Sequence, residues 1–186
     1  MNHLGTLSLE TDRLILRRFT PEDAPAMFRN WAGDPAVTEY LTWPTHPDEH
    51  VTAFVIGNWI SRYDNPTCYE WALELKSLGE PIGSIAVVRA QENGPVSTAE
   101  IGYCMGRPWW GQGLMPEALR AVNAFLFDRV GYTRIEARHA ADNPKSGRVM
   151  QKAGMTRAGV FRRADVCNHG VGDMVVYEML PDDIRP

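Results

Sequence analysis

A glycine-rich turn that leads into a predicted helix is the part of this sequence best suited to chemistry. It reads Trp109-Trp110-Gly111-Gln112-Gly113-Leu114-Met115-Pro116 and follows a strand-like run. Unpaired N–H groups at a helix N-terminus, together with the positive end of the helix dipole, can hold an anion such as phosphate. Glycines at 111 and 113 let a pyrophosphate approach the backbone, and Pro116 costs little in a first turn. The pattern predicts a phosphate-binding turn, although Gly-x-Gly also occurs in ordinary tight turns.

Two familiar phosphate-binding loops do not fit this turn. A Walker A loop would end in Gly-Lys-Ser/Thr, which is missing here. A Rossmann fingerprint would place a third glycine where Pro116 stands, and its ribose-binding acid, for which Glu136 has about the right spacing, would fall inside a predicted strand. A nucleotide-bearing acyl carrier, with its pyrophosphate on the turn, remains as the ligand.

Composition limits the class of protein. The chain has 186 residues, of which 44% are apolar and 23% charged, and its formal net charge is -4. This length predicts one globular domain, and the mildly acidic balance disfavours a nucleic-acid partner. The amino terminus carries no apolar leader, and no run approaches the roughly 20 apolar residues of a membrane span. We therefore expect a cytoplasmic protein with no membrane partner.

Metal and disulfide chemistry are not expected. Cys68, Cys104 and Cys167 are far apart and form no CxxC pair. His46 and His50 stand four residues apart but lack a third ligand at a suitable spacing, so a solvated helix start explains them better than a metal site.

Hydrophobic periodicity and turn residues predict a mixed α/β domain with the element order β-α-α-β-β-β-α-β-α-β-β. Short connections between the three middle strands make them an antiparallel meander. The expected strands are 14–19, 69–75, 81–89, 99–105, 134–140, 155–166 and 171–180. The expected helices begin near Thr20 and Pro47, after Gly113, and at Pro144.

Three segments together resemble a known family. They are the run Ala99–Met105, the glycine turn, and the run Asp142–Met155, and the opening Glu10–Arg17 adds to the likeness. The chain resembles the GNAT acetyltransferases over roughly Leu9 to Leu180, and within them the branch typified by ribosomal-protein alanine N-acetyltransferases. The resemblance implies a single N-acetyltransferase domain over residues 1–186. It also implies a central, mostly antiparallel sheet of six to seven strands flanked by about four helices.

The resemblance also implies acetyl-CoA as co-substrate and a primary amine as acceptor, either a protein amino terminus or a small amine. Backbone N–H groups of the turn would receive the pyrophosphate, and the end of the preceding strand would bind the pantetheine arm. Asn143 would bind the cofactor arm or cap its helix. Arg148 and Lys152, four residues apart on the same predicted helix, could meet the adenosine phosphates or could be ordinary exposed basic residues. The cofactor-binding residues are then Cys104, Met105, Gly111, Gln112, Gly113, Leu114, Met115, Asn143 and Arg148. Two positions depart from the general family pattern: Trp110 replaces a polar residue and Met115 a small one.

Two catalytic residues are predicted, each with a simpler alternative. Ser146 could hydrogen-bond the departing thiolate or could merely face solvent, and Met150 stands where many relatives have tyrosine. Glu100 could accept the ammonium proton as general base, or it could pair with Arg89 or Arg134 on a neighbouring strand.

The leading hypothesis is therefore an N-acetyltransferase that acts by direct attack in a ternary complex. The alternative is a coenzyme A-binding sensor or partner-binding module without turnover. A monomer and a homodimer remain equally open. An aromatic group could line an acceptor groove or close the core, and it consists of Trp31, Tyr40, Trp43 and Trp59.

Overall fold

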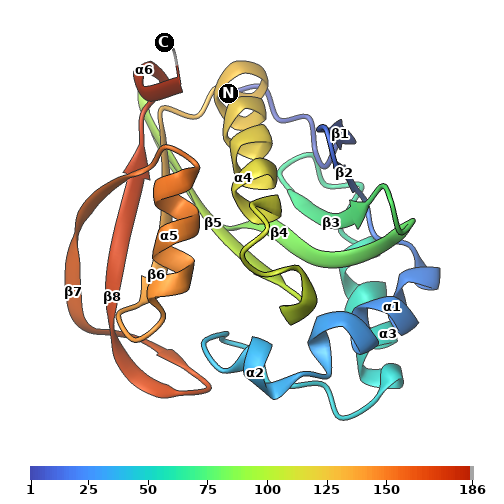
Figure 1. The fold of residues 1–186 in the computed structure, drawn as a ribbon. Coiled ribbons are helices and arrows are strands. Elements are labelled where there is room, and N and C mark those ends of the chain that lie inside the picture. The colour runs from blue at the N-terminus through green and yellow to red at the C-terminus, as the bar shows by residue number, and fades with distance from the viewer. Residues whose placement is uncertain (185–186) are drawn as a thin grey trace.

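The computed structural model describes residues 1–184 and arranges their strands in one twisted sheet (Figure 1). The eight strands are β1 (Leu9–Glu10), β2 (Leu14–Arg17), β3 (Glu70–Leu75), β4 (Glu80–Asn93), β5 (Val96–Met105), β6 (Arg134–Ala140), β7 (Thr156–Cys167) and β8 (Gly170–Met179). Their order in the sheet is β1-β2-β3-β4-β5-β6-β8-β7, and only β5 and β6 pair in parallel. The predicted mixed α/β class and the mostly antiparallel sheet are confirmed.

Helices cover both faces of this sheet. They are α1 (Ala24–Met27), α2 (Pro35–Thr38), α3 (Glu49–Ile60), α4 (Leu114–Phe125), α5 (Pro144–Lys152) and α6 (Pro181–Ile184). Shorter helical turns precede or extend some of them: η1 (Pro21–Asp23), η2 (Phe28–Ala32), η3 (Arg107–Trp109) and η4 (Leu126–Val130). No helix within residues 1–184 has the length and apolarity to cross a membrane.

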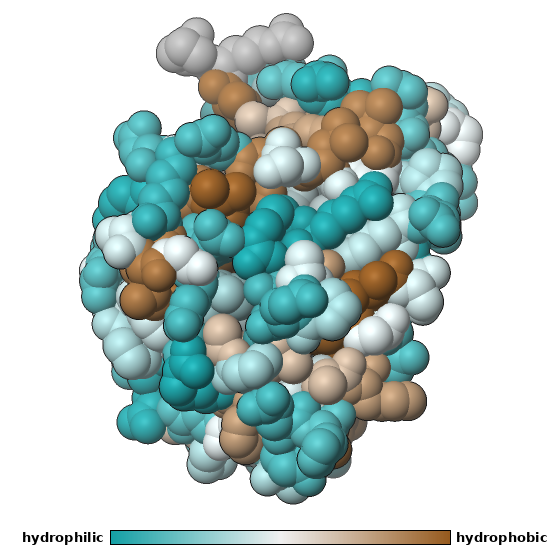
Figure 2. All heavy atoms as spheres, turned by 90° about the vertical axis from the view of Figure 1, so that its right-hand side faces the viewer, coloured by the Kyte–Doolittle hydropathy of each residue, from teal (hydrophilic) through white to brown (hydrophobic). Residues whose placement is uncertain are grey.

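The alternation of side chains along β3 divides the core in two. Trp71 and Leu73 pack with α4 and α5 on one face, in the larger apolar cluster. Ala72 joins Trp31 and Ile56, from η2 and α3, in the smaller cluster on the other face. We call these the α4/α5 face and the α1/α3 face. Seen from the side of β1 to β3, the apolar surface areas are small and separated by polar side chains (Figure 2).

Strand boundaries show where local prediction was incomplete. The segment 91–95 reads as a loop in the sequence, but Gln91–Asn93 continue β4 and pair with residues 96–98 of β5. A turn at Gly94, whose φ is 63°, joins the two strands tightly, so the hairpin extends further than its turn residues suggested. The two-residue strand β1 also escaped prediction because two residues are too few to show a repeating hydrophobic pattern.

The sheet opens between β5 and β6. Parallel pairing begins at Thr98 with Arg134 and ends at Ile101 with Ala137. Beyond that point residues 102–105 pair only with β4, and residues 138–140 pair only with β8. Short connections then lead from these strand ends to the N-termini of α4 and α5, which stand side by side (Figure 1). The fold thus creates a gap in the sheet, here called the opening, directly beside two helix N-termini.

Candidate active site

The glycine turn presents a row of unpaired backbone donors beside the opening. Gly111 and Gly113 both adopt the left-handed conformation with a φ of 78°, and Gly113 is the N-cap of α4 without a side-chain cap. Among residues 1–184, no acceptor receives the N–H groups of the five residues 111–115. Consecutive free N–H groups at a helix start form an anion-binding concavity. The five residues that the sequence assigned to the pyrophosphate, Gly111, Gln112, Gly113, Leu114 and Met115, are therefore brought together.

The turn is fixed by a charged residue from the start of the chain. The guanidinium of Arg13 donates to the Gln112 carbonyl at 2.9 Å and to the Glu117 carboxylate at 2.8 Å. Thr11 Oγ1 donates to the same carboxylate at 2.7 Å. Burial alone would raise the pKa of Glu117, but these hydrogen bonds and the charge of Arg13 hold it below its ordinary value. Sequence reasoning missed these hydrogen bonds because the residues that form them lie about 100 positions apart in the chain.

Trp110 connects the start of the glycine turn to β5 and to α5. Its Nε1 donates to the Met105 carbonyl at 2.6 Å, and its exposed ring lies 5.2 Å from Lys145 Nζ on α5. This cation–π contact connects the turn to the first turn of α5 across the opening. The tryptophan therefore replaces the family's polar residue with a side chain that spans the site.

The backbones of Cys104 and Met105 face opposite ways. Gly106 N–H donates to Ile82 on β4 at 2.9 Å, and the Cys104 carbonyl also points toward β4, against Gly83. Since backbone groups alternate along a strand, the Met105 backbone faces the opening. The Cys104 thiol lies on the α1/α3 face, where burial raises its pKa to about 11. Of this predicted pair, Met105 is the one whose backbone borders the opening.

Asn143 and Ser146 stand at the start of α5, on the other side of the opening. Asn143 occupies the N-cap position but makes no capping hydrogen bond with its side chain, so the amide is not used as a cap. Ser146 is half-buried, and its Oγ lies 3.0 Å from the Tyr103 hydroxyl, which donates to the Ser146 carbonyl at 2.9 Å. Burial raises the pKa of Tyr103, so the phenol keeps its proton. Ser146 thus faces β5 instead of solvent.

Glu100 lies apart from this group. Its carboxylate forms ion pairs with Arg89 at 3.1 Å and with Arg138 at 3.0 Å. The alternative prediction of an ion pair with Arg89 is therefore confirmed. Arg134 instead pairs with the carboxylates of Glu136 and Glu178. Glu100 alternates with Ile101 and therefore points to the α1/α3 face, whereas Tyr103 reaches α5 on the opposite face. The structure brings Ser146 to Tyr103 but does not bring it to Glu100.

Arg148 and Met150 lie further along α5. Arg148 is exposed and has no ion-pair partner among residues 1–184. Met150 is 1% exposed and belongs to the larger apolar cluster, so it contributes packing where many relatives place a tyrosine.

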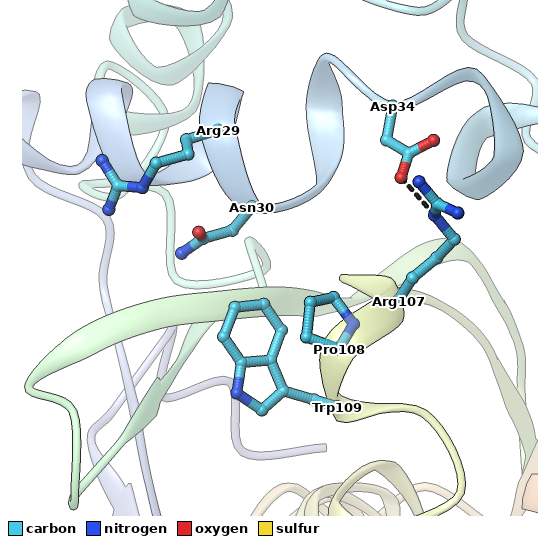
Figure 3. Close-up of a pocket in the computed structure, with 6 residues that line it drawn as sticks. All are labelled: Arg29, Asn30, Asp34, Arg107, Pro108 and Trp109. Carbon is cyan, nitrogen blue, oxygen red and sulfur yellow. Dashed lines mark hydrogen bonds and ion pairs between the residues drawn. The ribbon is translucent and has the colours of Figure 1, made fainter.

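A hollow of about 580 Å³ lies next to the C-terminal end of β5 (Figure 3). It is lined by Arg29, Asn30, Asp34, Arg107, Pro108 and Trp109. Arg107 pairs with Asp34 across it, and Arg29 pairs with Glu80 at 2.6 Å. Both guanidinium groups that line the hollow are thus paired with carboxylates.

The predicted aromatic group divides between the core and the edge of the site. Trp31 is fully buried, and Trp59 packs on Phe19 with ring centroids 4.9 Å apart. Tyr40 instead lies 5.2 Å from the His169 ring at the tip of the β7–β8 hairpin. Asn168 in the same tip donates to the carbonyls of Thr38 and Trp43 at 2.8 and 2.7 Å. The hairpin is thereby tied to the end of α2 and to the segment that follows it.

Comparisons with known proteins show the family of this chain and the likeness of its fold to solved structures. A family model described as an acetyltransferase (GNAT) domain matches residues 13–156. YoaA, an uncharacterized N-acetyltransferase of Bacillus subtilis, is 32% identical over 173 residues, or 92% of this chain and 96% of the relative. The ribosomal-protein-serine acetyltransferase of Escherichia coli is 29% identical over 85 residues, or 46% of this chain and 48% of the relative. A solved structure of RimL, a ribosomal alpha-N-protein acetyltransferase in complex with coenzyme A, has a TM-score of 0.82 at 20% identity, covering 95% of this chain and 99% of that one.

The chain therefore belongs to the GNAT acetyltransferases. Its relatives include a ribosomal-protein acetyltransferase, in agreement with the branch that the sequence resembles.

Proposed function

We propose that the protein uses acetyl-CoA to acetylate a primary amine, with both substrates bound together. The acceptor is either a protein amino terminus or a small amine. The observation that carries the proposal is the row of five unpaired N–H groups at residues 111–115 beside a gap in the sheet. A solved structure with the same fold holds coenzyme A, the product form of this donor.

The turn suits the phosphate end of acetyl-CoA, and the opening suits its thioester end. The N–H groups of Gly111 to Met115 would hold the pyrophosphate, and Arg148 would meet the adenosine phosphates. The Met105 N–H would bind the pantetheine arm, since the Met105 carbonyl already accepts from Trp110, and the uncommitted amide of Asn143 would bind the arm from the other side. The thioester would then lie in the opening between β5 and β6.

The chemistry follows from these positions. The deprotonated amine attacks the thioester carbonyl carbon, the nitrogen lone pair forms the new C–N bond, and the C–S bond breaks with its electron pair on sulfur. Ser146 Oγ–H stabilises the thiolate by a hydrogen bond, and the proton released from nitrogen passes to a base. Glu100, the base that the sequence nominated, already forms ion pairs with Arg89 and Arg138 on the α1/α3 face.

A thiol-release assay tests the proposed function. The protein is given acetyl-CoA with a panel of peptides, polyamines and amino sugars, and coenzyme A binding is measured separately by calorimetry. We expect binding, and release of thiol in equal amount to an acetylated amine. Tight binding with no thiol release for any acceptor would instead establish the coenzyme A-binding module without turnover.

A further inference from the structure

Glu70, the first residue of β3, lies in line with the point where the sheet opens. It pairs across to Ala86 on β4, and Ala86 pairs to Gly102 on β5. Gly102 is the first residue of β5 beyond the part paired with β6. Neighbouring strands lie about 4.8 Å apart, so Glu70 and Gly102 are separated by roughly 10 Å along this row.

The Glu70 carboxylate faces the α1/α3 side. It alternates with Trp71, which packs on the α4/α5 face, and it shares its face with Ala72. Between Glu70 and the opening, the row carries only the methyl group of Ala86 and the hydrogen of Gly102. The row itself therefore contributes no large side chain between the carboxylate and the opening, and only Val88 from the irregular part of β4 lies against Gly102.

The Glu70 carboxylate is short of hydrogen-bond donors. Its side chain is only 14% exposed, and within residues 1–184 no group donates a hydrogen bond to it. The nearest cation, Arg62, lies 3.8 Å away and is itself 56% exposed. By contrast, Glu74 on the same face holds Arg17 at 2.6 Å. Buried carboxylates are normally hydrogen-bonded, so the lone pairs of Glu70 are left for a ligand or water.

The backbone of Glu70 is held firmly even though its carboxylate is not. Its N–H donates to Thr6 Oγ1 at 2.9 Å, and the Tyr63 hydroxyl donates to its carbonyl at 3.0 Å. These contacts hold the backbone of Glu70 and leave both of its carboxylate oxygens free.

The environment of Glu70 favours a carboxylate that can take up a proton near neutrality. Burial raises its pKa to about 7, and the charge of Arg62 only partly opposes this. The other titratable side chains that its charge reaches are Tyr63, Cys68 and Cys104. Since burial also raises the pKa of each of these three groups, all stay protonated and neutral near pH 7.

Glu100 is less well placed than Glu70 for this task. Val88, in the irregular part of β4 between Val87 and Arg89, lies against Gly102 and is 61% exposed. Its apolar side chain therefore stands between the Gly102 row and the ion pairs of Glu100.

We infer that Glu70 is the proton acceptor for the amine, reached through ordered water, and that the amine enters the opening from the α1/α3 face. This inference rests on the proposed function. The ammonium proton passes to the Glu70 carboxylate by way of the water, and the freed lone pair attacks the thioester carbon. The C–S bond then breaks with its electron pair on sulfur, toward the α4/α5 face where Ser146 lies, and the departing thiolate takes up the second proton that nitrogen loses as the amide forms. The base and the thiolate partner thus act from opposite faces of the sheet.

Glu70→Gln tests this inference in the full chain, with Glu74→Gln as the matched control. Both changes remove a carboxylate from the same face of β3. For Glu70→Gln we expect kcat to fall by about 10²-fold or more, as for loss of a general base, with acetyl-CoA affinity within about twofold of wild type. The wild-type kcat should decline as pH falls through about 7, because Glu70 becomes protonated, and the variant should lack this limb.

Partial recovery of kcat in Glu70→Asp and near wild-type turnover per folded molecule in Glu74→Gln would support the assignment. Equal kcat and an unchanged acid limb in Glu70→Gln would overturn it and leave the proposed function intact. A wild-type protein that binds acetyl-CoA but releases no thiol would overturn the proposed function and this inference with it.

Discussion

The hydroxyl of Tyr103 on β5 lies 3.0 Å from Ser146 Oγ on α5 and ties together the two sides of the opening. A phenol has a single proton, and Tyr103 donates it to the Ser146 carbonyl at 2.9 Å. Ser146 therefore keeps its own hydroxyl proton, either for the phenol oxygen or for a thiolate that forms beside it. This contact gives the serine a defined direction that a solvent-facing helix position would lack.

Tyr103→Phe should weaken turnover more than binding. Loss of one hydrogen bond of about 1 kcal/mol predicts a kcat lower by roughly five- to tenfold, with acetyl-CoA affinity changed by less than about threefold. Steady-state kinetics and calorimetry on the single variants and on Ser146→Ala/Tyr103→Phe measure both quantities. If the tyrosine acts through the serine, the double variant should be no slower than Ser146→Ala, whereas additive losses would show that the two hydroxyls act independently.

Gly111→Ala should weaken coenzyme A binding beyond its cost in stability. Its φ of 78° is unfavourable for alanine by about 1 kcal/mol, and the added methyl group would stand in the open space beside the turn that the pyrophosphate would use. Gly79→Ala is the matched control, because Gly79 has a φ of 70° and, like Gly111, has open space where a Cβ would stand. We expect similar losses in Tm for both variants, but an increase in the Kd for coenzyme A, about tenfold or more, only for Gly111→Ala. Equal Kd values would refute the assignment of the turn.

Glu117→Gln should make the protein less sensitive to acid. The folded-state pKa of Glu117 is lowered, so its contribution to stability is present above its unfolded pKa and is lost as pH falls through the folded value. Thermal unfolding from about pH 6 to about pH 3 should therefore show a smaller drop in Tm for the variant than for wild type. The opposite order would mean that Arg13 does not hold this carboxylate in its charged form.

Glu70→Gln should stabilise the protein at alkaline pH. A carboxyl whose pKa rises from 4.5 to about 7 on folding binds its proton more tightly in the folded state, so stability falls as pH rises between these values. A shift of this size is on the order of 3 kcal/mol, and glutamine avoids it. Denaturant unfolding should show the variant to be more stable than wild type at about pH 8 and equal to it below about pH 5. A less stable variant at pH 8 would contradict the burial of an ionised Glu70.

Sequence patterns were sufficient for those parts of the fold that local rules determine. The alternation of apolar residues in Trp71 and Leu73 and the glycines at 111 and 113 follow such rules, and these elements lie where they were expected. The position of β8 between β6 and β7 was not predictable, because strand order depends on pairing between distant segments. The opening was likewise not predicted, because it depends on where the pairing between β5 and β6 ends.

The candidate site was predicted best where it consists of consecutive residues. The turn from Gly111 to Met115 is a local feature, so its sequence was enough to predict it. Glu70 was missed because its relation to Gly102 depends on the register of three strands, which a sequence does not state. Tyr103 reads as an ordinary core residue of a strand, and only the packing of α5 shows its contact with Ser146.

The most direct test of the central claim follows the backbone amides of the glycine turn by NMR during titration with coenzyme A. Pantetheine, which lacks the pyrophosphate, is the comparison ligand. The amides of residues 111–115 have no acceptor within residues 1–184, so we predict that all five shift strongly with coenzyme A and little with pantetheine. Saturation by coenzyme A with these five amides unmoved would contradict the assignment of the turn as the pyrophosphate site.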